Sequence, residues 1–247
     1  MKIVFLGIGD AFDENYLNTS ILVESKTKIL LDCGPTIPFQ LWKYNPDPDF
    51  LDALYISHFH ADHYFGIPTL FTRWCAEGRT KPVTVIGQKG VKKQVSKLLE
   101  LGYKELLPGY KFQINYIEVE PGKKVSFNEF KLDFIPVRHF NLVLGIKMMT
   151  NGKILCYSGD GELSEETKKF YSGADLLIHE AFLINEDVEF HSNVKSLIEF
   201  SKENKVKLIA LVHLKRTLRK DKEKILELIR KNKVKVILPE IFQEIVI

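Results

Sequence analysis

Cysteine is scarce in this sequence, with only Cys33, Cys75 and Cys156 among 247 residues. The three are odd in number, lie far apart and form no CxxC pair. We therefore expect them to be small buried hydrophobic side chains of a protein from a reducing compartment.

Long apolar runs are also missing. No stretch approaches the ~20 consecutive apolar residues that a membrane-spanning helix needs, so we expect no membrane partner. The apolar run at residues 1–6 is too short for the hydrophobic region of a signal peptide. Together these absences favour a cytoplasmic protein.

Low-complexity linkers and hinges rich in serine and glycine are absent as well. At ~100–200 residues per domain, this length fits one large domain or two small ones. Because no linker divides the chain, we expect a single domain over residues 1–247, large enough to bury a sizeable core.

Short apolar or alternating runs predict strands along the whole chain, and segments with helical spacing separate them. In the first half we expect strands at residues 2–6, 20–23, 28–31, 53–56 and 83–86, and helices near 38–44, 64–77 and 91–102. In the second half we expect strands at 114–118, 131–135, 143–149, 154–157, 176–178, 208–212 and 234–238, helices after 164, near 194–201 and near 225–229, and a short tail. This α/β pattern predicts two sheets stacked face to face with helices outside.

Residues 57–63 read Ser-His-Phe-His-Ala-Asp-His and hold three histidines and one aspartate within six positions. The motif follows a short apolar run that is typical of a strand. At a strand end His58 and His60 point the same way, while Asp62 and His63 fall on the turn beyond and can face a second metal. A lone histidine is more often structural than a ligand, but this density indicates metal binding. Imidazole with carboxylate suits zinc, iron, manganese or nickel.

Three further candidates, His139, Asp160 and His213, lie just past predicted strand ends. Sites in such sheets collect at one end of the strands, so these residues can converge with the first motif. Taken alone, each fits a structural role equally well, as a turn cap or a polar strand end. Taken together, they favour a metal site.

The order His58-x-His60-x-Asp62-His63, then His139, Asp160 and His213, resembles the metallo-β-lactamase superfamily over nearly the whole chain. The resemblance implies a four-layer αββα sandwich with two divalent metal ions at one edge, zinc being expected and manganese or iron the alternatives. It also implies the ligands: His58, His60 and His139 for the first metal, Asp62, His63 and His213 for the second, and Asp160 as the bridge. The oxygen-reducing di-iron members usually carry a glutamate at the position of His60, so the histidine favours a hydrolase.

Several segments resemble ribonuclease Z within this superfamily. His179-Glu180-Ala181-Phe182 is similar to its His-Glu-Ala-Thr element, and His191-Ser192-Asn193 is similar to its His-Ser-Thr loop. Residues 32–34 and 65–68 also resemble its segments. The departures are Phe182 and Asn193, where threonine is usual, and Leu17, where arginine is frequent.

The connection between His139 and Asp160 departs further from that family. Enzymes that cut tRNA precursors usually carry a protruding tRNA-binding arm between these two ligands. Here the space is filled by a strand pair that turns at Asn151-Gly152, a favourable hairpin turn. The resemblance therefore implies the fold and the metal chemistry, and we expect a small phosphodiester or a short single-stranded nucleic acid, RNA included, as substrate.

The implied chemistry assigns roles to four side chains. Two metals ~3.5–4 Å apart can share one hydroxide and lower its pKa towards neutrality, so that it attacks phosphorus. Asp62 can accept the proton of the attacking water. The resemblance gives His191 contact with the phosphate or protonation of the leaving group, with His179 as the other histidine that can reach the site. Glu180 can orient a histidine, or it is a carboxylate at a sheet end.

Positive charge gathers towards the end of the chain. Residues 205–235 hold twelve Lys or Arg and three acids, a local charge of +9, although the whole chain carries only +3. Lys215, Arg216, Arg219 and Lys220 follow His213 directly, and a basic rim there suits a phosphodiester. The alternative is a solvated helix face. No aromatic residues alternate with these lysines, so the run indicates no base-stacking platform.

Other functions fit parts of the same pattern. The chain is alternatively a tRNA 3′-processing endoribonuclease, or a lactonase, thioesterase or β-lactam hydrolase on the same scaffold. A non-catalytic metal-binding or RNA-binding module is the remaining alternative, and the complete ligand set argues against it. A homodimer is a further expectation.

Overall fold

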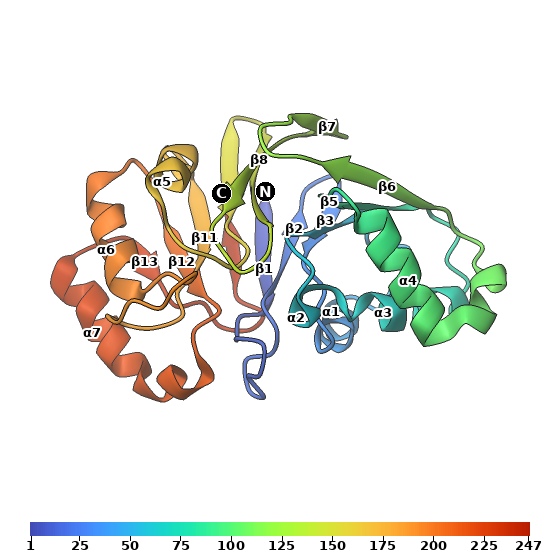
Figure 1. Cartoon of the computed structure of the whole chain (residues 1–247), viewed down its shortest axis with the longest axis horizontal. Coiled ribbons are helices and arrows are strands. Elements are labelled where there is room, and N and C mark those ends of the chain that lie inside the picture. Colours follow the sequence, from blue (N-terminus) through green and yellow to red (C-terminus); the bar gives the residue numbers. More distant parts are fainter.

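The computed structural model describes the backbone of residues 1–247 and all side chains except those of Arg219 and Lys220. Two sheets of seven strands each lie face to face (Figure 1). The first has the order β14-β1-β2-β3-β4-β5-β6, with β1 Lys2–Gly7, β2 Ser20–Glu24, β3 Lys28–Leu31, β4 Ala53–Ile56, β5 Val83–Gln88, β6 Ile114–Val119 and β14 Glu244–Val246. The second has the order β13-β12-β11-β10-β9-β8-β7, with β7 Val125–Phe127, β8 Phe130–Val137, β9 Val143–Thr150, β10 Lys153–Tyr157, β11 Leu176–Glu180, β12 Ile209–Val212 and β13 Val236–Ile237.

Helices cover the outer face of each sheet. One set consists of α1 Ile37–Tyr44, α2 Ala61–Tyr64, α3 Ile67–Ala76 and α4 Val91–Tyr103; the other consists of α5 Glu165–Tyr171, α6 Val194–Glu203 and α7 Lys222–Asn232. Figure 1 shows the two sets on opposite sides of the molecule. Two short 3-10 segments, η1 Lys104–Gly109 and η2 Arg216–Asp221, complete the chain.

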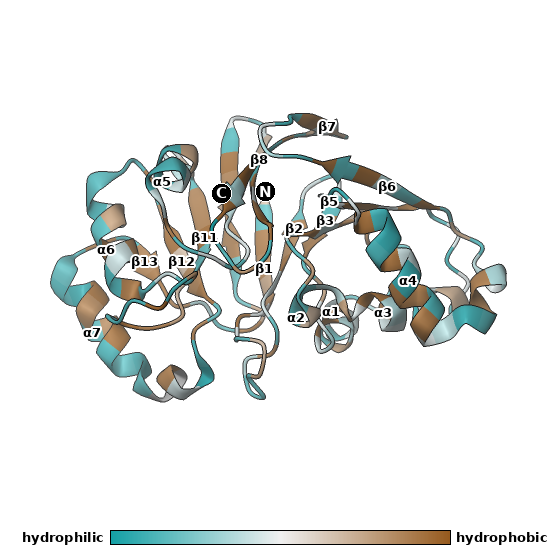
Figure 2. Cartoon of the chain, viewed as in Figure 1, coloured by the Kyte–Doolittle hydropathy of each residue, from teal (hydrophilic) through white to brown (hydrophobic). Residues whose placement is uncertain are grey.

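Three apolar clusters hold these layers together. One lies between the sheets and includes Phe5, Tyr55 and Phe134, all at most 1% exposed. The others lie between each sheet and its helices. The strands are accordingly hydrophobic along most of their length, while the helices carry many hydrophilic residues (Figure 2). The predicted αββα sandwich is confirmed.

Three details differ from the sequence-based expectation. The predicted short tail forms β14, which pairs with β1 so that Ile3 lies opposite Ile245, and β7 was not expected. The helix expected over residues 64–77 begins only at Ile67, as α3, and a separate short helix, α2, occupies residues 61–64, where a turn was expected. A Cβ atom on Gly66, between the two helices, would lie 2.2 Å from the carbonyl oxygen of Gly34, so only glycine fits there.

Strand direction places the functional residues at one edge of the molecule. Strands β10, β11 and β12 are parallel, so their carboxyl ends meet at the same edge. Asp160, Glu180 and His213 lie at or just beyond these three ends. Within the described residues, no helix combines the length and apolar character that crossing a bilayer requires.

Candidate metal centre and active site

Two groups of side chains at this edge have the composition and spacing of metal sites. His58, His60, His139 and Asp160 form one group, and Asp62, His63, Asp160 and His213 form the other. In each group, the candidate ligand atoms lie within 4.8 Å of one another. Asp160 belongs to both groups. The structure therefore brings together all seven side chains that the sequence predicted as metal ligands, in the two groups that were expected.

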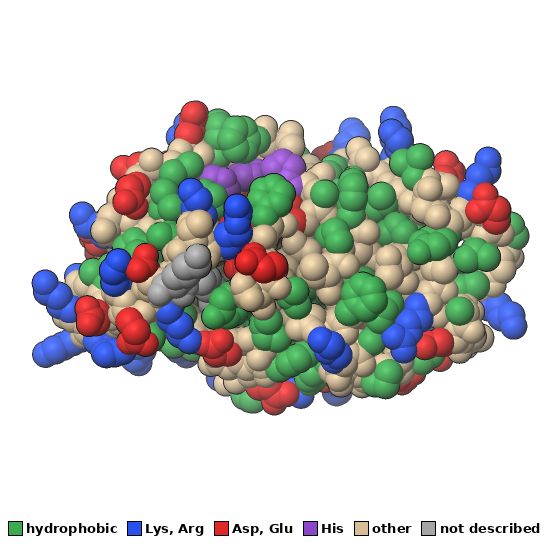
Figure 3. Space-filling model, turned by 90° about the horizontal axis from the view of Figure 1, so that it is seen from below, with side chains coloured by type: hydrophobic (Ala, Val, Ile, Leu, Met, Phe, Trp, Pro, Cys, Tyr) green, Lys and Arg blue, Asp and Glu red, His purple; other side chains and the backbone are tan. Residues whose placement is uncertain are grey.

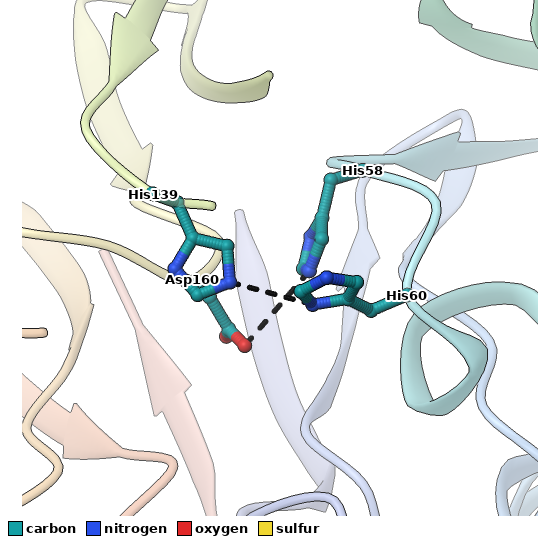
Figure 4. A group of neighbouring side chains, drawn as sticks. All are labelled: His58, His60, His139 and Asp160. Carbon is teal, nitrogen blue, oxygen red and sulfur yellow. Dashed lines mark hydrogen bonds and ion pairs between the residues drawn. The ribbon is translucent and has the colours of Figure 1, made fainter. Parts of the chain in front are cut away.

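Figure 4 shows the first group: His58 and His60 come from the segment after β4, His139 from the end of β8 and Asp160 from the segment after β10. His60 Nδ1 lies 3.3 Å from His139 Nε2. His58 Nε2 lies 3.9 Å from Asp160 Oδ2. The side chains thus converge from both sheets on one small volume.

In the second group, the same Asp160 Oδ2 lies 3.2 Å from His63 Nε2 and 3.2 Å from His213 Nε2. Asp62 Oδ2 lies 3.1 Å from His63 Nε2 and 3.4 Å from His213 Nε2. The shared carboxylate makes Asp160 the geometric centre of the site.

Buried polar atoms without partners support metal binding. His58 Nε2 and Asp160 Oδ1 are buried and have no hydrogen-bond partner among the described residues. Leaving such atoms unpaired in the interior costs about 1–3 kcal/mol each, more for a charged group. A divalent cation would satisfy both atoms, and a set of imidazole and carboxylate donors suits such a cation.

Neighbouring groups orient the histidine rings. His58 Nδ1 lies 3.0 Å from Ser57 Oγ, and His139 Nδ1 lies 3.2 Å from the carbonyl oxygen of Phe190. Asn141 Nδ2 lies 3.0 Å from His60 Nε2. Each contact engages one ring nitrogen and leaves the other directed into the site, which is how metal-binding histidines are usually held.

Asp32 holds the second group in the same way. Its buried carboxylate accepts hydrogen bonds from the backbone N–H of Ser57 at 2.8 Å, from Ser57 Oγ at 2.7 Å and from the Tyr157 hydroxyl at 2.7 Å. It also lies 2.8 Å from His63 Nδ1, which fixes Nε2 towards Asp160. In the sequence, Asp32 is only part of a segment that resembles the family, and no role was predicted for it.

Charge coupling sets the protonation of the ligands. Burial lowers the pKa of His58 well below its ordinary value, and the neighbouring His63 adds to that effect. Burial opposes protonation of His213, but Asp160 and Asp62 outweigh it and raise its pKa to about 9. The imidazoles in turn hold the pKa of both aspartates well below the usual range, despite burial. Metal binding must therefore displace protons from the second group.

The metal-ligand groups lie at the floor of a cavity of about 840 Å³. Figure 3 shows histidine side chains in this hollow, with hydrophobic side chains and basic residues around them. The N-terminal loop contributes Asp10, Phe12 and Asp13, and the segment after β8 contributes Phe140. Phe12 and Phe140 are 77% and 67% exposed. No pattern in the sequence marks these lining residues, because their role depends on loops that come together only in the folded chain.

The predicted basic rim is partly present. Lys215 and Arg216 line the cavity: Lys215 Nζ lies 5.9 Å from the centre of the Phe182 ring, and the Arg216 guanidinium lies 6.0 Å from that of Phe12. The backbone N–H of Arg216 donates to Asp10 Oδ2 at 2.9 Å. The side chains of Arg219 and Lys220, which were also predicted to line the approach, lie outside the described residues.

His191 also lines the cavity, next to Glu180. His191 Nδ1 lies 3.5 Å from Glu180 Oε1, and the His191 ring stacks on Phe182 with centroids 4.6 Å apart. The backbone N–H of Ser192 donates to the same Glu180 oxygen at 2.7 Å. Burial raises the pKa of Glu180, although His191 opposes the shift. The structure thus gives Glu180 the histidine neighbour that the sequence suggested.

His179 is not brought to the site. It is fully buried, does not line the cavity, and its ring packs 5.6 Å from that of Tyr171 behind the sheet. Its Nδ1 lies 2.8 Å from the carbonyl oxygen of Glu180. Because adjacent residues of a strand point to opposite faces, His179 points away from the face on which Glu180 meets His191. The catalytic role predicted for His179 has no geometric support.

The burial of His179 instead predicts that the fold loses stability in acid. Burial lowers its pKa to about 4 from an ordinary 6.5, so the folded chain holds it neutral while the unfolded chain is protonated as the pH falls. The destabilisation is absent above pH 6.5 and grows to about 3 kcal/mol as the pH falls to 4. Denaturant unfolding of wild type and His179→Gln across this range is expected to show a steeper loss in the wild type. Parallel curves of stability against pH for the two proteins would contradict this prediction.

Comparisons with known proteins agree with this site. The family model described as Anti-Pycsar protein Apyc1 matches residues 1–235. A curated relative, ribonuclease Z of Methanosarcina mazei, is 25% identical, and the alignment covers 87% of each chain. The crystal structure of the short form of human tRNase Z has a TM-score of 0.82 at 22% identity and covers 100% of this chain and 99% of its own. A diphosphatase of the PhnP family has a TM-score of 0.77 at 17% identity and covers 100% and 97%.

The match over residues 1–235 and the shared fold confirm the resemblance that the histidine and aspartate motifs predicted. The site has the residues to bind divalent metal ions, with Asp160 common to both groups. The chain belongs to the Anti-Pycsar protein Apyc1 family and is a ribonuclease Z-like, metal-dependent hydrolase of the metallo-β-lactamase superfamily.

Proposed function

We propose that the protein is a dinuclear metal-dependent phosphodiesterase that acts on small phosphodiesters or short single strands. The observation that supports this most directly is the position of Asp160, which is shared by two ligand groups at the floor of a cavity with a basic side. Two divalent ions held there would supply a Lewis acid for the phosphoryl oxygens and lower the pKa of the attacking water. Curated relatives named ribonuclease Z add support for a phosphodiester substrate.

The protein's own side chains divide the remaining work. The Asp62 carboxylate is ionised, because His63 and His213 hold its pKa low, and it lines the cavity where it can accept the proton of the attacking water. His191 faces the same cavity and can donate a proton to the leaving oxygen. Lys215 and Arg216 lie on the wall and attract the negative phosphodiester.

The exposed aromatic side chains suggest how the rest of the substrate is held. Phe12 and Phe140 line the cavity but remain mostly exposed, so that part of each ring can contact a flat group. Stacking of a base on an aromatic side chain contributes about 1–3 kcal/mol. We propose that they contact a planar substituent of the phosphodiester.

Replacing Phe12 with alanine is expected to raise KM for a nucleotide phosphodiester by about 5- to 100-fold while kcat changes little, because the lost contact is to a group that does not react. The matched control is Phe39→Ala, which removes another exposed phenylalanine, on α1 and outside the cavity lining. Equal KM values for wild type and Phe12→Ala would exclude the contact.

The connection between His139 and Asp160 bears on substrate size. It consists mainly of β9 and β10, joined by a tight turn in which Asn151 and Gly152 both have positive φ. This connection has no protruding segment that could grip the elbow of a tRNA. We propose that recognition is local to the scissile phosphate and its immediate neighbours.

The decisive experiment compares a 3′-extended tRNA precursor with an unstructured RNA of the same end sequence across a salt series. Comparable cleavage of both is expected, with apparent affinity that falls as salt rises, because Lys215 and Arg216 contact phosphate. Site-specific cutting of the precursor alone would instead indicate a compact tRNA-processing endoribonuclease. Activity on lactones, thioesters or β-lactams without phosphodiester cleavage would favour the acyl hydrolases, and fully metal-loaded protein without hydrolysis would favour a binding module.

Three finer assignments belong to the same proposal. Zinc is the proposed metal, because three histidines with one carboxylate in a tight group suit it. A homodimer is proposed because Phe39, Phe65 and Leu101 leave apolar surface exposed on the helices of the first half. The cytoplasm is the proposed location, in keeping with the free cysteines. Elemental analysis and sedimentation test the first two.

A further inference from the structure

We propose a second binding surface, distinct from the metal centre: a lysine-lined groove at the ends of α6 and α7 that binds the phosphate backbone of nucleic acid without regard to sequence. This surface goes beyond the hydrolytic function, and its binding does not depend on that function. We call it the lysine groove. It is defined by Lys195, Lys202, Lys205, Lys207, Lys231, Lys233 and Lys235.

The lysine groove consists of two adjoining hollows. One, of about 400 Å³, lies between α6 and α7, and the other, of about 480 Å³, lies over the segments that follow these helices. Lys202 and Asn232 line both hollows, and Lys202 Nζ donates to Asn232 Oδ1 at 2.6 Å. The surface is therefore one continuous concave track.

The charge of the lysine groove is large for this protein. Its lining holds seven lysines and one acid, Glu199, a net charge of +6. The whole chain carries only +3, so the remaining side chains together carry −3. All seven lysines are exposed, and among the described side chains only Lys207 has a carboxylate partner, Asp175, at 2.7 Å. The other six charges lack a partner that would neutralise them.

The lysine groove is separate from the metal centre. Lys207 and Lys235 precede the parallel strands β12 and β13, whereas His213 follows β12 at its other end. Six residues of extended chain span roughly 20 Å. The basic run at residues 205–235 is thus divided: Lys215 and Arg216, from the predicted rim, reach the cavity, while Lys205, Lys207, Lys233 and Lys235 lie at the opposite edge. Figure 3 shows basic side chains gathered at the α6–α7 end of the molecule.

The chemistry of the lysine groove fits a phosphate backbone better than a membrane surface. Lysines act as hydrated point charges, and neutralising phosphates with them releases counterions whatever the base sequence. Among the described residues, no aromatic side chain lines the groove, so the groove offers no ring on which a base could stack. Membrane-surface helices carry exposed large apolar residues, but here the apolar lining residues are buried or half-buried.

The test uses the full-length, metal-loaded protein and a fluorescein-labelled oligothymidylate with phosphorothioate linkages, which keep the charge and resist hydrolysis, followed by anisotropy across a salt series. Wild type is compared with a triple variant, Lys205→Gln, Lys233→Gln and Lys235→Gln. We expect the variant to bind at least about tenfold more weakly at low salt, with the slope of log K against log salt reduced by about 2 for three lost contacts. Hydrolysis of bis(p-nitrophenyl) phosphate should be unchanged, since none of these lysines lines the cavity.

A matched variant controls for net charge. Lys92→Gln, Lys93→Gln and Lys97→Gln remove three exposed lysines from α4, on the opposite side of the molecule. This control should bind the oligonucleotide like wild type. Equal weakening by both triple variants, or no weakening by either, would overturn the proposal. So would binding to phosphatidylserine vesicles that depends on the same lysines while oligonucleotide binding does not. Loss of hydrolysis with oligonucleotide binding intact would count against the proposed function alone.

Discussion

Replacing Asp160 with alanine is expected to reduce the metal content from close to two ions per chain to well below one, and to abolish hydrolysis. One carboxylate serves both ligand groups, with His63 Nε2 and His213 Nε2 each 3.2 Å away. Removing one partner of a buried charged group costs about 3–5 kcal/mol, which corresponds to a loss of about 10²- to 10⁴-fold in affinity. Because the carboxylate is shared, the loss falls on both sites together.

Elemental analysis after dialysis, alongside a competitive metal titration, measures the effect. Asp175→Ala is the matched control: Asp175 is also buried, but it binds Lys207 and the backbone N–H of Ile154, far from the ligands. It should lose stability and keep both metals. Full metal loading in Asp160→Ala would refute the bridging role, and loss of one metal alone would restrict Asp160 to one site.

The metal ligands were predictable because the information is local. Three histidines and an aspartate within six positions, after a strand, already indicate a site, and parallel strands bring their carboxyl ends to one edge. His139, Asp160 and His213 could be added because each directly follows a strand. Strand pairing supplies the remaining convergence, which is why the two ligand groups match the expected division.

Other residues could not be assigned from the sequence, because their role depends on contacts between segments that lie far apart in the chain. Phe12 and Phe140 lie on loops of opposite halves and meet only at the cavity. The carboxylate of Asp32 makes four polar contacts, and all of them are with residues that are distant in the sequence. Strand β14 was missed because its few residues, Glu244–Val246, gain stability only by pairing with β1.

The basic run and His179 show where sequence proximity misleads. Lys233 and Lys235 belong to the same basic run of the sequence as the residues after His213, but α7 carries them to the far end of β12 and β13. His179 was grouped with Glu180 although strand geometry permits only one of two adjacent side chains to face the cavity. The predicted strand ended at residue 178, whereas β11 continues to Glu180, so the alternation of His179 and Glu180 was not evident from the sequence.

Replacing His191 with alanine is expected to keep both metals and slow phosphodiester cleavage by about 10²- to 10⁴-fold, the usual contribution of a positioned general acid. His191 lines the cavity beside His139, with ring centroids 5.2 Å apart, but belongs to neither ligand group. The loss should appear in kcat and should depend on the leaving group. It should be large for an alkyl oxygen, which needs a proton to depart, and small for p-nitrophenolate, which does not.

Glu180 separates a role in catalysis from a role in structure. Its Oε1 lies 3.5 Å from His191 Nδ1 and holds the backbone N–H of Ser192 at 2.7 Å, so it positions the ring without reaching the substrate itself. Glu180→Gln keeps the shape and an acceptor oxygen for Ser192 but changes the group beside His191 Nδ1. We therefore expect Glu180→Gln to lower kcat for the alkyl substrate, by less than His191→Ala does, with little effect on the p-nitrophenyl substrate and with KM and metal content unchanged. An unchanged kcat for His191→Ala with the alkyl substrate would reduce His191 to a structural residue, and kcat for Glu180→Gln would then also equal that of the wild type.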